Sequence, residues 1–101
     1  MRLSKLAAGY PLIGGRLDYL QGRAVAALVY THRMHVINVF VWPAADASET
    51  LAPALERHGY HVLDGTHAHM TYWLVSDLNA GELAQFARML MPPAAGAPGS
   101  R

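Results

Sequence analysis

The chain has 101 residues and a mass of 11.0 kDa, with 52% apolar and 15% charged residues. These values exclude a disordered chain and leave room for one domain. Eight basic and seven acidic residues give a net charge of +1, so the chain lacks the basic field that nucleic-acid binding requires. It contains no cysteine, which excludes disulfides and thiolate metal sites.

The apolar runs are too short to span a membrane. The longest, residues 24–30 and 36–42, fall far below the roughly 20 residues that a bilayer requires. The first five residues are not followed by an apolar segment long enough for a secretory signal. If the protein works outside the cytoplasm, we expect a segment absent from this chain to carry it there.

The N-terminal half predicts one short helix and three strands. Residues 3–8 suit a helix that Gly9 ends, and Gly14-Gly15 is a pivot into the next segment. A short turn at Gln21-Gly22 then joins two strands, because glycine supplies the positive φ that such turns need. The strands are expected at residues 16–20, 24–30 and 35–42.

The C-terminal half predicts two more strands, at residues 60–66 and 70–76, and a second helix. Between the halves, residues 48–56 could open a short helix. Asp77 or Asn79 caps the final helix, because Asn79 and Glu82 have the spacing of a capping box. The apolar stripe of this helix consists of Leu83, Phe86, Ala87 and Leu90.

Together these elements predict a single α+β domain over residues 1–91 and a disordered tail over residues 92–101. Connections of hairpin length imply an antiparallel sheet of about five strands, in two hairpin or meander groups. The N-terminal and C-terminal helices would cover one face of it. Because strands 24–30 and 35–42 are apolar on both faces, the second face must also be covered. Either the loop 44–57 or a second protein molecule would do so.

The uncovered face is a candidate interaction surface. Along strand 35–42, side chains alternate between two sets, and either set could line that face. One set is Val36, Asn38, Phe40 and Trp42, and the other is His35, Ile37, Val39 and Val41. The predicted surface takes the first set together with Tyr72. Asn38 needs hydrogen-bond partners if buried, from a neighbouring strand or from a partner molecule. A homodimer through this face, or through an edge strand, would follow.

Six histidines are the main reactive feature of the sequence. His67 and His69 would lie on one side of a strand, a spacing that can chelate zinc, copper or nickel. His61 or His35 would be the third ligand. The alternative is that these histidines are unliganded turn and edge residues.

No arrangement of residues points to catalysis, and we predict neither an enzyme nor a cofactor. Ser76-Asp77 lies at a strand-to-helix junction, where an exposed serine nucleophile is conceivable. The sequence around it lacks the glycines of a nucleophile elbow. Capping of the following helix explains both residues better.

Several stretches of the chain resemble the C-terminal region of proteobacterial transmembrane anti-sigma factors. The resemblance spans about residues 6–91, and its most distinctive parts are Val-Ile-Asn-Val-Phe-Val-Trp-Pro at 36–43 and Met-Thr-Tyr-Trp at 70–73. The chain departs from the family where His67-Ala68-His69 replaces a glycine-rich turn.

In that family a cytoplasmic region binds an extracytoplasmic-function sigma factor, a single membrane helix follows, and a domain like this one lies in the periplasm. The cysteine-containing zinc motif of the sigma-binding region is absent here. The resemblance therefore implies the non-enzymatic sensory or regulatory half, on the periplasmic side of the inner membrane. Its partner would be another protein or a second copy, with no nucleic acid, and it would meet the membrane only through a segment absent from this chain. A histidine-dependent metal sensor is the alternative function.

Overall fold

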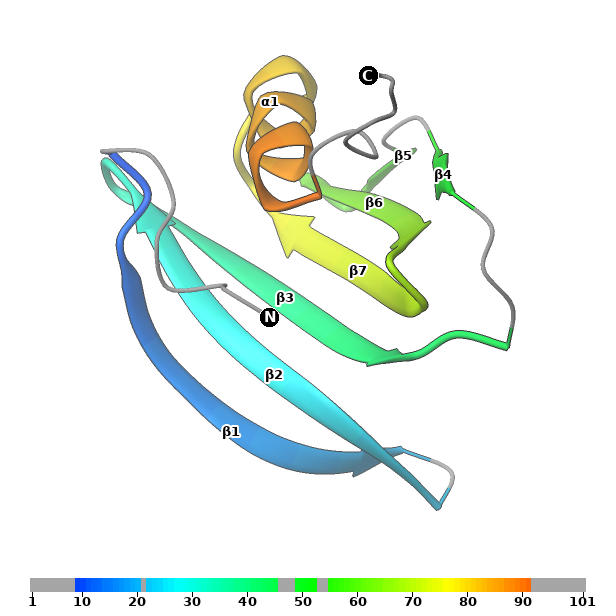
Figure 1. Ribbon diagram of the computed structural model, residues 1–101. Coiled ribbons are helices and arrows are strands. Elements are labelled where there is room, and N and C mark those ends of the chain that lie inside the picture. The colour runs from blue at the N-terminus through cyan, green and yellow to red at the C-terminus, as the bar shows by residue number, and fades with distance from the viewer. Residues whose placement is uncertain (1–8, 21, 46–48, 53–54, 92–101) are drawn as a thin grey trace.

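The computed structural model describes residues 9–20, 22–45, 49–52 and 55–91 of the chain. Within these residues, seven strands are followed by one helix (Figure 1). The elements are β1 (Leu12–Leu20), β2 (Arg23–His32), β3 (His35–Pro43), β4 (Thr50–Leu51), β5 (Leu55–Arg57), β6 (Tyr60–His67), β7 (Met70–Ser76) and α1 (Ala80–Leu90).

All seven strands belong to one antiparallel sheet. The order across it is β1-β2-β3-β7-β6-β4, and β5 also pairs with β6. The central pair, β3 and β7, joins segments that are far apart in the sequence. Figure 1 shows β1, β2 and β3 as long, curved strands, while α1 lies beside β6 and β7. The helix therefore sits over one end of one face of the sheet.

The core lies between α1 and that face, which we call the covered face. The predicted stripe of the helix is confirmed, because Leu83, Phe86, Ala87 and Leu90 are all buried. The ring of Phe86 meets the edge of Tyr30 at a centroid distance of 5.0 Å. The covered face contributes Tyr30, Ile37, Val39, Val41, Leu63, Tyr72 and Leu74 to the same core. Full burial of each large side chain there stabilises the fold by about 1.5–3 kcal/mol.

The predicted start of α1 is also confirmed, and Asn79 rather than Asp77 is the cap. The Asn79 Oδ1 accepts a hydrogen bond from the backbone N–H of Glu82 at 2.8 Å. In return, Asn79 Nδ2 donates to Glu82 Oε1 at 2.9 Å. Two polar side chains thus orient each other and satisfy a backbone donor that the first helical turn leaves free.

The turn between β6 and β7 forms where the sequence predicts it, although it contains no glycine. Ala68 and His69 have φ angles of 53° and 65°, a left-handed conformation that costs a non-glycine residue roughly 1–2 kcal/mol. The two strands pair in continuous register from His61 opposite Ser76 to His67 opposite Met70. This long pairing holds the turn in a conformation that a glycine-rich sequence would adopt at lower cost.

The predicted fold class, an α+β domain with about five strands and two helices, is wrong. The described residues form seven strands and a single, C-terminal helix. The predicted N-terminal helix at residues 3–8 and the tail at 92–101 lie outside the described residues. The first strand is also longer than predicted. Gly14 and Gly15, expected to be a pivot, pair with Val29 and Leu28 inside β1.

The two additional strands lie in the segment where the sequence predicts a short helix. Here β4 and β5 pair with β6 instead, because β6 offers a row of backbone donors and acceptors along its outer side. Thr50 Oγ1 accepts from the N–H of Thr66 at 3.1 Å, and the N–H of Ala52 donates to the carbonyl of Asp64 at 2.8 Å. Gly65 permits this approach, since a Cβ there would lie 2.6 Å from the carbonyl oxygen of Thr50.

Candidate functional site

The face of the sheet opposite α1, which we call the open face, carries a group of exposed apolar side chains. Val36 and Trp73 are 46% and 45% exposed, and Leu55 and Tyr60 are more exposed still. Strand alternation and register place all four on this face. Apolar and aromatic side chains of the open face, with Asn38 among them, are Val25, Ala27, Val29, Val36, Phe40, Trp42, Leu55, Tyr60, Val62, Trp73 and Val75, and of these Val25 and Ala27 are fully buried. Charged and polar residues on the same face include Arg16, Asp18, Asp64 and Thr71.

One row of side chains crosses the open face over five strands. It runs through Val29, Asn38, Val75, Val62 and Leu55, which lie opposite one another from β2 to β5. Asn38 is the one polar member of the row and is partly buried. Within the described residues its amide has no hydrogen-bond partner. Of the two roles predicted for Asn38, the cross-strand hydrogen bond is therefore not formed among these residues.

Aromatic rings dominate the neighbouring part of the open face. The rings of Trp42 and Trp73 lie with centroids 6.2 Å apart and planes tilted by 47°, which is within the range of favourable aromatic pairs. Phe40 lies directly opposite Trp73 in the β3–β7 register. An open hollow of about 450 Å³ adjoins this group and is lined by Arg23, Trp42, Pro43, Ala44, Ala45 and Thr71. Aromatic side chains with a few polar groups are typical of protein interfaces.

Of the five residues predicted for the interaction surface, Val36, Asn38, Phe40 and Trp42 lie on the open face. Tyr72 does not, because it lies opposite Val41 and is 2% exposed in the core. Its neighbour Trp73 takes the position on the open face. The alternation within strand 70–76 is visible in the sequence. The register between β3 and β7 decides which side of strand 70–76 lies on the same face as Phe40. The sequence alone does not determine this register.

The structure does not bring the four predicted metal ligands together. His61 and His67 lie near opposite ends of β6, a separation of about 20 Å at 3.3 Å per residue. His69 lies in the β6–β7 turn rather than on a strand beside His67, and His35 begins β3. Among the residues that the structure describes, no three histidine or carboxylate side chains form a group that could hold a metal ion.

Three of these histidines instead make one contact each through Nδ1. His35 Nδ1 lies 2.9 Å from Asp77 Oδ1, and His61 Nδ1 donates to the carbonyl of Leu78 at 2.8 Å. His67 Nδ1 lies 2.8 Å from a carboxylate oxygen of Glu49. A hydrogen bond from the N–H of Ala68 and this contact with His67 lower the pKa of Glu49. These contacts tie neighbouring segments together.

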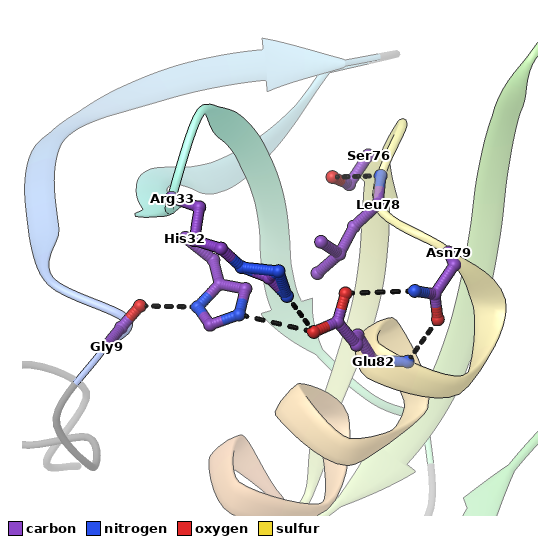
Figure 2. A network of polar contacts seen from close by, with 7 residues as sticks. All are labelled: Gly9, His32, Arg33, Ser76, Leu78, Asn79 and Glu82. Carbon is purple, nitrogen blue, oxygen red and sulfur yellow. Dashed lines mark hydrogen bonds and ion pairs between the residues drawn. The ribbon is translucent and has the colours of Figure 1, made fainter.

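A network of polar contacts fastens the start of α1 to the turn between β2 and β3, as Figure 2 shows. Arg33 donates a hydrogen bond to Glu82 Oε2, and His32 Nε2 lies 3.5 Å from the same oxygen. On its other side, His32 Nδ1 donates to the carbonyl of Gly9 at 2.7 Å, and its ring stacks on Tyr10 at 4.1 Å. The hydrogen bond from Arg33 is the main cause that lowers the pKa of Glu82. This network anchors the helix that defines the covered face.

Ser76, the candidate nucleophile considered from the sequence, is fully buried and has a structural role. Its hydroxyl donates to the carbonyl of Val36 at 2.8 Å and accepts from the N–H of Leu78 at 3.0 Å. Both bonds hold the junction between β7 and α1, so the hydroxyl proton is already committed to a carbonyl oxygen.

Comparisons with protein-family models, curated protein sequences and solved structures found no match to this chain. No helix in the part of the chain that the structure describes combines the length and the apolar character needed to cross a membrane.

Proposed function

We propose that this chain is a non-enzymatic protein-binding domain. It would be the sensory and regulatory half of an anti-sigma-factor-like membrane regulator, on the periplasmic side of the inner membrane. A partner protein binds the open face, and the binding changes the association of the regulator. The membrane helix and the sigma-binding region would lie outside this chain.

The observation that carries the proposal is the gathering of exposed apolar side chains on one face. Val36, Leu55, Tyr60 and Trp73 come from four different strands and share the open face. Burying apolar area stabilises a complex by roughly 25 cal/mol per Å² before the costs of association. Large aromatic residues such as Trp73 are the side chains that most often dominate binding energy.

The polar groups of the open face support a specific rather than a general apolar contact. The side-chain amide of Asn38 lies among apolar neighbours and makes no hydrogen bond within the described residues. A partner that buries this amide must therefore supply hydrogen bonds to its N–H groups and its oxygen. Arg23 at the rim of the hollow beside Trp42 offers a positive charge. A partner with a backbone segment or polar side chain facing Asn38 and an acidic group near Arg23 would fit this surface.

The direct test places a photo-crosslinking amino acid at position 73 of the protein in its native cells, with position 85 as the matched control. Gln85 is exposed on α1, away from the open face. We expect one defined partner to crosslink at position 73 and not at position 85, identified by mass spectrometry. Equal crosslinking at both positions, or none at position 73, would contradict binding at the open face.

The regulatory part of the proposal has its own readout in the transcripts of the same cells. We expect the double substitution Phe40→Ser and Trp73→Ser to reproduce the transcript changes caused by deleting the gene. Gln85→Ser should leave the transcripts unchanged. If deletion itself changes no transcripts, the regulatory assignment is wrong, whatever the crosslinking result.

A further inference from the structure

The strand β1 forms one edge of the sheet and differs from the opposite edge. In the described part of the chain β1 pairs with β2 alone. It is nine residues long, whereas the opposite edge is built from β4 and β5, which have two and three residues. Short edge strands limit pairing with other chains, whereas a long edge presents a continuous row of backbone donors and acceptors.

The side chains of β1 are unusually apolar for an exposed edge. Leu17 and Tyr19 are 62% and 67% exposed, on the same side of the strand. The helix α1 does not cover them, because it packs against β6 and β7 at the other end of the sheet. On the opposite side of β1, which is the open-face side, Arg16 and Asp18 are neighbours, and Arg16 Nε donates to Asp18 Oδ2 at 3.0 Å.

The order of these residues makes β1 complementary to itself. We infer that β1 pairs antiparallel with β1 of a second copy of this chain, with Leu17 at the two-fold axis. In this register Arg16 of each copy lies opposite Asp18 of the other, which forms two cross-strand ion pairs. Leu17 meets Leu17, and Tyr19 lies opposite Gly15, where its ring would pack beside Leu28, whose Cδ2 lies 3.2 Å from the position that a Cβ on Gly15 would take.

Neighbouring registers are disfavoured by charge. If the two copies form one continuous sheet with both α1 helices on the same side, the two-fold axis passes through a residue of β1 that lies opposite its own copy. With Arg16 on the axis, the Arg16 side chains of the two copies would lie opposite each other. With Asp18 on the axis, the two Asp18 side chains would do so. Like charges directly opposite each other destabilise a strand pair. The net charge of +1 gives two whole copies little reason to repel each other. The pairing uses the backbone edge of β1, and Trp73 is not part of it.

Charge exchange on the full chain tests this pairing, with sedimentation velocity as the measurement. The wild-type chain should form a dimer as concentration rises. Arg16→Asp and Asp18→Arg should each raise the dimer Kd at least roughly tenfold, since like charges then face each other. An equimolar mixture of the two variants should dimerise again, because every facing pair has opposite charges. The double variant R16D/D18R should also dimerise on its own.

Recovery on mixing separates a lost contact from a lost fold. Trp73→Ser is the control and should leave the dimer unchanged. A wild-type chain that stays monomeric at high concentration would overturn the inference. So would a dimer that neither single variant weakens, or one that mixing does not restore. If Trp73→Ser alone abolishes the dimer, the second copy binds the open face, and the β1 pairing is wrong.

Discussion

The two faces of the sheet are made from similar residues but have different environments. Along β3, Ile37, Val39 and Val41 are buried in the core that includes the apolar stripe of α1, whereas Val36 on the alternate side is exposed. Both sides are rich in valine and aromatic residues. Along β3 the difference therefore does not come from hydrophobicity but from the position of α1, which packs on one side of the sheet.

This comparison shows where the fold is stabilised and where it is available for binding. A side chain on the covered face fills space between the helix and the sheet, so its loss leaves a cavity. An exposed side chain on the open face, such as Trp73, has solvent on one side, so its loss removes little packing. Matched substitutions on the two faces should therefore separate stability from association.

The largest difference is expected between Phe86→Ala and Trp73→Ala. Phe86 is fully buried against Tyr30, and its truncation should lower the free energy of unfolding by about 3–5 kcal/mol. Trp73 is half-exposed, and its truncation should cost no more than about 1 kcal/mol. Urea denaturation followed by circular dichroism measures both. Equal losses would mean that the open face is packed as tightly as the covered face.

A smaller difference is expected between the polar residues of the two faces. Ser76→Ala leaves the Val36 carbonyl and the Leu78 N–H without their partner, which should cost about 1–3 kcal/mol. Asn38→Ala on the open face removes no hydrogen bond among the described residues, so its cost should be within about 0.5 kcal/mol. Thermal unfolding of both variants compares them, and a larger loss for Asn38→Ala would contradict the hydrogen bonding described here.

The smallest effect concerns acid and the anchoring of α1. The folded pKa of Glu82 lies below its ordinary value of 4.5, chiefly because of the hydrogen bond from Arg33. Its contribution is therefore fully present above pH 4.5 and is lost as the pH falls through the folded pKa. We expect Glu82→Gln to flatten the fall in stability below pH 4.5 in an acid titration followed by circular dichroism. Parallel curves for the variant and the wild type would show that this contact does not stabilise the fold.

Local features of this protein follow from its sequence. The cap at Asn79, its pairing with Glu82 and the buried stripe ending at Leu90 were all predictable, because they depend on contacts within a few residues. The alternation that puts Val36 and Ile37 on different sides of one strand follows from strand geometry. The assignment to a known family and the proposed function remain predictions.

The tertiary structure decided the features that depend on pairing between distant segments. The β3–β7 register placed Trp73 rather than Tyr72 on the open face, and the free edge of β6 turned residues 50–51 and 55–57 into strands instead of a helix. The helix and strand propensities of single residues differ by a few tenths of a kcal/mol. A segment that pairs with a neighbouring strand gains backbone hydrogen bonds and buries side chains, and these gains outweigh such differences. The partners that become available only when the chain is folded therefore determine these positions.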